Sequence, residues 1–307
     1  MSHGFLAVNN SNQVLVSSDT RNLHFVGKYT APSTIIKSES GYGGINIFNY
    51  RVTCAVTPVP FFTMPNPGDF YSVGRVTQVT ATEWDIEVVK SGVAGYYPEL
   101  YIFSDPRGAT NSETHGMIVY RDDGSPAFDS RLRPLAITHS FNITQPSIPK
   151  ISIPGGLSAR YCESTPVQGD YFLPTEYNSY TISVMPEKPM FFYASLAQAE
   201  KEDAKYEADE DAFFGIFGFL YADYYEWWST YWAFYRGAVK APSSTEIQAG
   251  WLTINHDCNW DYHKDSGGFF GFLGGSGSRT GGIQPYSNET INLSSTSFLI
   301  ANASRYD

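Results

Sequence analysis

Few stretches of the sequence place reactive residue types at spacings that support chemistry. The most metal-like cluster is HDCNWDYH, which supplies His256, Cys258 and His263. In a strand, residues 256 and 258 would share a face, which suits two ligands. A structural zinc site needs four ligands at familiar spacings, and these spacings are not among them. We therefore expect polar packing and no metal here, with a metal site as the alternative.

Catalytic motifs are missing from the sequence. It contains no G-x-S-x-G, no Walker A motif and no H-E-x-x-H. The run GGSGSRTGG at 274–282 lacks the lysine and the strand-before, helix-after context of a phosphate loop, so it is interpreted as a flexible hinge. The adjacent Asp122 and Asp123 stand before Gly124 and fit a turn better than acid–base catalysis. We expect no enzyme activity and no cofactor.

Two aromatic-rich stretches rise above the background. FFGIFGFLYADYYEWWSTYW and FFGFLGG place bulky rings beside small glycines, and an exposed patch of this kind would aggregate unless it met a partner. The partner could be a protein subunit, a membrane interface or sugar rings; alternatively, the stretches fold into a small core of their own. The candidate interaction residues are Phe213, Phe214, Phe217, Phe219, Tyr224, Tyr225, Trp227, Trp228, Trp232, Phe269, Phe270 and Phe272.

Composition indicates the fold class of the elements that carry these residues. The chain has 307 residues, 42% of them hydrophobic and 16% aromatic, with 22 Tyr and 21 Phe, which favours packed β-structure over disorder. The net charge of −11, without a Lys/Arg cluster, argues against nucleic-acid binding. Three widely spaced cysteines, Cys54, Cys162 and Cys258, predict free thiols rather than a disulfide framework.

Two stretches of the sequence repeat one pattern. HGFLAVNNSNQVLVSSDTRNL at 3–23 and HGMIVYRDDGSPAFDSRLRPL at 115–135 both begin with His-Gly and end in Ser-x-x-Arg-x-Leu, at a constant offset of 115 − 3 = 112. Each reads as a β-hairpin. Arg21 and Arg133 recur at equal positions, which indicates structural anchors. Later in each copy a Trp-bearing strand, TEWDIEVVKSG or GWLTINHD, precedes an apolar strand that ends near an arginine.

This duplication predicts an all-β fold of two tandem β-sandwich domains, residues 1–110 and 111–307. The second domain would carry insertions at about 195–245 and 258–290. The first begins with SLAQAEKEDAKYEADED, which lacks Gly and Pro and predicts an acidic helix over 195–211. Asp223 and Glu226 argue against a transmembrane helix in the stretch that follows.

The repeated stretches resemble small β-rich virion proteins of tailed bacteriophages. The pattern is carried by Gly116, Asp123-Gly124, Phe128-Asp129-Ser130 and Trp84; copy one departs from it, with Asn12 in place of Gly and Val16-Ser17-Ser18 in place of Phe-Asp-Ser. The resemblance covers the opening stretch of each copy plus the late strands, and none of the insertions. It implies a structural protein of the phage tail or tail tip that assembles in the host cytoplasm.

From the resemblance we expect other virion tail proteins as partners and a homo-oligomer with three- or sixfold symmetry. Host contact, with a surface glycan or a membrane, would pass through the aromatic insertions. The alternative function is a carbohydrate- or receptor-binding module for host attachment.

Overall fold

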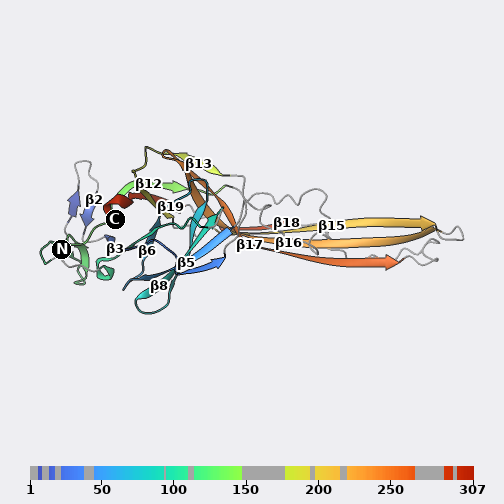
Figure 1. Cartoon of the computed structure of the whole chain (residues 1–307), viewed down its shortest axis with the longest axis horizontal. Helices are drawn as coiled ribbons and strands as arrows, with labels where there is room; N and C mark the ends of the chain where they lie inside the picture. Colours follow the sequence, from blue (N-terminus) through green and yellow to red (C-terminus); the bar gives the residue numbers. More distant parts are fainter. Residues whose placement is uncertain are drawn as a thin grey trace.

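The computed structural model describes residues 6–8, 14–17, 22–37, 45–92, 95–109, 114–146, 177–193, 198–214, 220–266, 287–292 and 296–307. The described segments are all-β, as the composition indicates: they form strands joined by turns and two 3-10 turns, η1 (Pro106–Gly108) and η4 (Ala303–Arg305). Two facing sheets make a sandwich, and a long ribbon of strands projects from one end of it (Figure 1).

The first sheet has six strands in the order β12-β19-β14-β6-β9-β3. Their bounds are β3 (His24–Tyr29), β6 (Val59–Phe62), β9 (Leu100–Ser104), β12 (Ile137–Ile143), β14 (Pro189–Tyr193) and β19 (Thr296–Asn302).

The second sheet runs in the order β13-β17-β16-β7-β8-β5-β4, with β15 paired to β16 and β18 paired to β15 off this path. Its strands are β4 (Thr34–Lys37), β5 (Ile45–Thr53), β7 (Tyr71–Gln78), β8 (Glu83–Ser91), β13 (Asn178–Thr181), β15 (Gln198–Phe214), β16 (Leu220–Ser243), β17 (Glu246–Ser266) and β18 (Ser287–Asn292).

The core lies between the two sheets. Burial along β5 largely alternates, so that Phe48, Tyr50 and Val52 face inward, as expected for a strand with one buried face. Aromatic rings from the first and the second half of the chain meet there: the ring centroids of Phe62 in β6 and Phe191 in β14 are 6.3 Å apart. A core cluster of described residues draws its side chains from both sheets, which is the packing of a β-sandwich.

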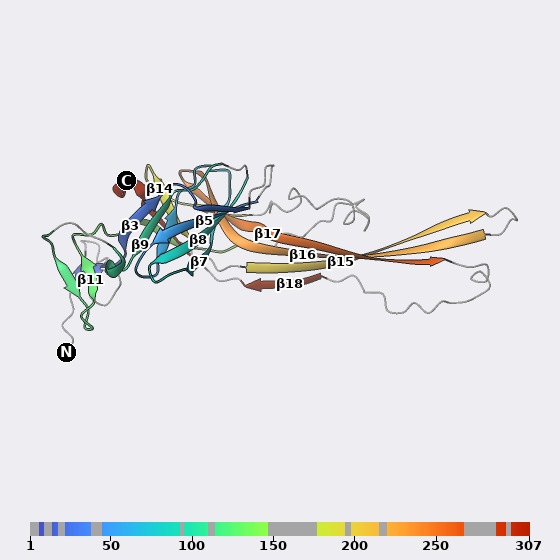
Figure 2. The same cartoon turned by 60° about the horizontal axis from the view of Figure 1, so that its bottom comes forward.

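The two copies begin with hairpins of the same register. One is β1 (Leu6–Val8) with β2 (Val14–Ser17), and the other is β10 (Ile118–Tyr120) with β11 (Pro126–Asp129). Leu6 pairs with Ser17, and the residues at the repeat offset from them, Ile118 and Asp129, pair with each other. The other two pairs, and the irregularity in each ladder, correspond at the same offset. Both hairpins lie at the end opposite the ribbon (Figures 1 and 2).

The same offset continues into the sheets. The pairing of β3 with β9 is irregular between Phe25 and Gly27, and that of β12 with β19 is irregular at the equivalent place, between Ile137 and His139. At the level of whole strands, the order β3-β9-β6 in copy one matches β12-β19-β14 in copy two, and β5-β8-β7 matches β13-β17-β16. Both copies therefore share one strand order.

The copies do not form separate sandwiches, which corrects the expected division at residue 110. Equivalent strands pair antiparallel across the boundary, Phe62 of β6 with Phe191 of β14 and Tyr71 of β7 with Val239 of β16. Each copy supplies three strands of the six-stranded sheet, and the nine-stranded sheet takes four strands from copy one and five from copy two. This pairing removes four open strand edges that two separate sandwiches would have to protect.

The acidic stretch predicted as a helix is a strand, so the expected helical insertion is wrong. Residues 198–214 form β15, which pairs with β16 along its whole length. Local helix propensity amounts to a few tenths of a kcal/mol per residue. A continuous ladder of partner residues on the neighbouring β16 overrides it.

Candidate functional site

The ribbon is the largest feature that the sandwich does not need for its own core. Its central strand β16 has 24 residues, about 80 Å at a rise of roughly 3.3 Å per residue. Tyr235, Ala238 and Val239 near its C-terminal end are buried in the sandwich. The N-terminal part of β16 extends outward with β15 and β17 on either side, and the ribbon twists along its length (Figure 2).

Two insertions that are separate in the sequence combine to make this ribbon. β15 and β16 lie within the insertion predicted at about 195–245, whereas the outer part of β17 and residues 287–290 of β18 lie within the one predicted at about 258–290. Trp227, for example, pairs with Glu207 on one side and with Tyr262 on the other. The sequence carries no sign of this association, because it depends on pairing between distant segments.

The ribbon brings together only part of the predicted interaction residues. Tyr224, Tyr225, Trp227, Trp228 and Trp232 all lie in β16, and Phe213 and Phe214 end β15, where Phe213 pairs with Tyr221. Five others lie outside the described residues: Phe217, Phe219, Phe269, Phe270 and Phe272.

Long stretches of the ribbon edges have no partner strand among the described residues. β18 covers only Gln198–Asp203 of β15, and β13 covers only Glu246–Ala249 of β17. Beyond these points the backbone of β15 continues over 204–214, and that of β17 over 250–266. An edge of this length offers unpaired N–H and C=O groups to another chain.

A scan against protein-family models, a search of curated proteins and a search of solved structures each find no match. Within the described part of the chain, no helix has the length and apolar character to cross a membrane.

The candidate metal cluster lies on β17. His256, Cys258 and His263 pair with Ala233, Tyr231 and Glu226 of β16. In the parts of the chain whose side chains the structure describes, no group of three metal-ligating residues occurs. Of the cysteines, Cys54 is buried and free.

The polar residues of the repeated hairpins have structural partners. Asp123 Oδ1 accepts hydrogen bonds from the backbone N and the hydroxyl of Ser125, which lowers the pKa of its carboxyl group. Gly124 adopts a φ of 77°, as a tight turn requires. The Arg133 guanidinium lies 5.7 Å from the ring centroid of Phe25. These contacts fit the turn and anchor roles expected for Asp123 and Arg133; Arg21 lies outside the described residues.

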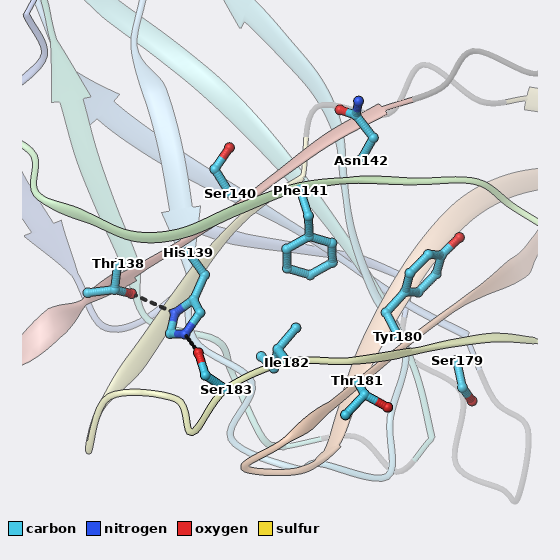
Figure 3. A pocket seen from close by; sticks show the side chains of 10 residues that line it. All are labelled: Thr138, His139, Ser140, Phe141, Asn142, Ser179, Tyr180, Thr181, Ile182 and Ser183. Carbon is cyan, nitrogen blue, oxygen red and sulfur yellow. Dashed lines mark hydrogen bonds between the residues drawn. The ribbon is translucent and has the colours of Figure 1, made fainter. Parts of the chain in front are cut away.

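A second candidate site, which the sequence did not indicate, is a groove at the copy-two edge of the sandwich. It lies between β12 on one side and β13 with the two residues that follow it, Ile182 and Ser183, on the other (Figure 3). β12 and β13 are end strands of the two sheets. His139 and Phe141 from β12 point toward Tyr180 and Ile182 (Figure 3). The groove is open to solvent and has a volume of about 630 Å³, within the roughly 300–1,000 Å³ typical of small-molecule sites.

Hydrogen bonds hold the polar side chains of the groove in place. The two ring nitrogens of His139 lie 3.1 Å from Thr138 Oγ1 and 2.7 Å from Ser183 Oγ. The Tyr180 hydroxyl accepts from the backbone N of Thr144 at 2.7 Å and lies 3.0 Å from its carbonyl oxygen. The rings of Phe141 and Tyr180 are tilted at 37° with centroids 6.1 Å apart. The floor of the groove is therefore preorganised.

Proposed function

We propose that the chain is a structural component of a bacteriophage tail or tail tip and that its ribbon is the element that assembles with other chains. The length of the ribbon is the observation that carries this proposal. Among the side chains that the structure describes, those of β16 and β17 enter the core at the inner ends of the strands, where Tyr235, Val239 and Trp251 are buried. We infer that the outer ribbon serves contacts with other chains.

A ribbon of this shape is a poor structure for an isolated chain. Two- and three-stranded antiparallel sheets need a packed face to be stable in water. Long uncovered edges also pair with other strands. A neighbouring copy, or another virion tail protein, would satisfy both requirements by covering the outer faces of β15, β16 and β17. Within the virion, assembled in the host cytoplasm, such coverage would be permanent.

The charge of β15 suggests how the ribbon avoids premature association. The strand contains seven acidic residues and two lysines. Like charges on neighbouring chains repel one another at a distance and slow association between free subunits. Close and specific pairing in the particle would overcome this repulsion. The acidic residues are Glu200, Glu202, Asp203, Glu207, Asp209, Glu210 and Asp211.

The relation between the two copies bears on the symmetry of the assembly. Equivalent strands pair with each other at the junction, so the copies are related by an approximate twofold operation. A ring of six equivalent domains needs head-to-tail contacts instead. We therefore propose three chains associated through their ribbons rather than six equivalent domains in a ring.

The alternative is a carbohydrate- or receptor-binding module in which the β16 aromatics contact the host surface. Both proposals assign the chain no enzymatic activity and no cofactor. They differ in the expected effect of losing the ribbon: the assembly proposal predicts loss of the oligomer, whereas the attachment proposal predicts an intact oligomer that no longer binds cells.

Shortening the ribbon tests the assembly proposal. Tyr206 and Trp228 are directly opposite in the β15–β16 ladder, so replacing residues 207–227 by Asn-Gly closes a two-residue hairpin. Thermal unfolding of the sandwich should stay within a few degrees of the full chain, while mass photometry should show monomers in place of trimers. Virions carrying the shortened ribbon should fail to assemble normally.

The matched control is Tyr120→Ser, which removes a 56% exposed aromatic side chain from β10, in the hairpin at the end opposite the ribbon. It should leave the oligomer intact. If the full chain is monomeric both in solution and in the particle, or if the shortened chain assembles normally, the proposal is wrong.

A further inference from the structure

The groove between β12 and β13 has a lining suited to an uncharged, hydroxyl-rich ligand. None of its ten lining residues is Asp, Glu, Lys or Arg. The net charge of the whole chain, by contrast, is −11. The lining instead carries hydroxyl, amide and imidazole groups beside two aromatic rings and one isoleucine. Apart from the imidazole of His139, no side chain among these residues could offer a counter-ion to a charged ligand.

The polar groups of the groove retain capacity for a ligand. A hydroxyl donates one hydrogen bond and accepts two, so Ser183 can still bond a ligand while it contacts His139. Ser140 and Asn142 on β12, and Thr181 on β13, are exposed along the rims and point away from the floor (Figure 3). Polar groups at fixed positions around an apolar floor are the usual means of orienting a small ligand.

The floor offers apolar contact at the same site. Phe141, Tyr180 and Ile182 are partly buried and pack against the core cluster, so they are supported from below. The Tyr180 ring is further fixed through its hydroxyl by Thr144. A pyranose ring has one face of C–H groups and a rim of hydroxyls, which matches an aromatic floor with polar rims.

The groove leaves one edge of β13 without a partner among the described strands. β13 pairs only with β17. In copy one the corresponding strand β5 pairs on its outer side with β4, with Ile35 opposite Phe48. The residues at the repeat offset from β4, 146–149, lie almost entirely outside the described residues.

From these contacts we propose that the groove between β12 and β13 binds a neutral oligosaccharide. The proposal is independent of the ribbon, because no lining residue belongs to β15, β16 or β17. It places carbohydrate contact at a site different from the aromatic insertions.

Titration of the full chain with defined sugars tests the site. The probes are maltohexaose and chitohexaose, which are neutral, and a hyaluronan hexasaccharide, which is acidic. Methyl NMR spectra of the isoleucines report the location: a neutral hexasaccharide should shift the Ile182 methyl signals and leave those of Ile35 and Ile36 in β4 unchanged. The acidic sugar should shift neither set.

Variants then test the named contacts. His139→Ala combined with Ser183→Ala should weaken binding of the neutral sugar about tenfold or more, the effect of losing one or two good hydrogen bonds. Thr34→Ala, which removes an exposed hydroxyl from the edge strand of copy one, should leave the affinity unchanged.

Several results would overturn the proposal. One is that neither neutral hexasaccharide shifts Ile182 at millimolar concentration. Another is that the double variant binds like the wild type. A third is that the groove binds a β-strand instead of a sugar. The peptide STIIKS, the sequence of residues 33–38, would then shift the Ile182 methyl signals, whereas the sugars would not. The chain with the shortened ribbon should still bind the sugar, so failure of the assembly proposal leaves this one testable.

Discussion

Replacing Lys90 by methionine should destabilise the sandwich far more than the removal of one surface charge would. The Lys90 side chain is fully buried, and its Nζ lies 2.8 Å from Asp69 Oδ2, whose side chain is 10% exposed. The rings of Tyr96 and Tyr71 lie near the ammonium group, with centroids at 5.7 Å and 6.0 Å. Lys90 also pairs with Tyr71 of β7, the strand that joins copy one to copy two.

The expected magnitude follows from what the substitution leaves behind. The Asp69 carboxylate lies against the backbone of Gly92, at a place where an added Cβ would be only 2.1 Å from its Oδ1, and its side chain is 10% exposed. Methionine fills most of the lysine volume but leaves this carboxylate buried without its cation. Breaking a buried ion pair from one side costs about 3–5 kcal/mol. At about 2 °C per kcal/mol for a chain of this size, the melting temperature should fall by roughly 6–10 °C.

A double-mutant cycle with thermal unfolding at neutral pH measures this coupling. Asp69→Asn combined with Lys90→Met removes both charges, so it should recover a substantial part of the loss. The matched control is Arg51→Met, which breaks the pair with Asp85 on the exposed surface of the same sheet, where the side chains are 43% and 25% exposed. That change should lower the melting temperature far less, because water screens an exposed pair. If Lys90→Met proves as mild as Arg51→Met, the reasoning from burial is refuted.

Two further predictions concern titration and surface charge. His24 is buried; its Nδ1 lies 3.0 Å from the carbonyl oxygen of Asn22 and its Nε2 3.4 Å from the backbone N of Asp129, contacts that a neutral ring satisfies. Burial lowers the pKa of His24, although the Asn22 carbonyl and the carboxylates of Asp129 and Asp105 act in the opposite direction. The contribution of the neutral His24 ring to folding stability is therefore complete above pH 6.5 and is lost as the pH falls below that value. Urea unfolding at pH 7.5 and 5.5 should show a smaller loss in His24→Gln than in the wild type; equal losses would contradict the assignment. The Asp307 carboxylate forms ion pairs with Lys188 at 2.8 Å and with Lys28 at 2.7 Å, which lowers the pKa of this carboxyl group. Asp307→Asn should lower the free energy of unfolding by about 1 kcal/mol at low salt and by less at 1 M salt, because the ion pairs are partly exposed and salt screens them. A cost that does not change with salt would argue against a charge network.

Local features of the fold could be predicted from the amino-acid sequence. High aromatic and apolar content indicated β-structure, and the offset of 112 placed two hairpins whose ladders match pair for pair. Asp123-Gly124 indicated a turn because the side chain and the backbone of these residues favour it without help from the rest of the chain. The duplicated strand order follows from the same repeat, since equal patterns fold into equal strands.

Which strand edges meet is set by long-range packing. Nothing in the residues around Phe62 and Phe191 states that β6 and β14 pair, so the two copies read as separate sandwiches although they share both sheets. Residues 198–214 read as a helix because their propensity is local, and they form a strand because β16 supplies a partner along their whole length. The groove likewise needs His139 and Ile182 to come together from separate segments of the chain. Pairing of strand edges has almost no signature in a single sequence, because backbone groups make the bonds and every residue except proline carries the same ones.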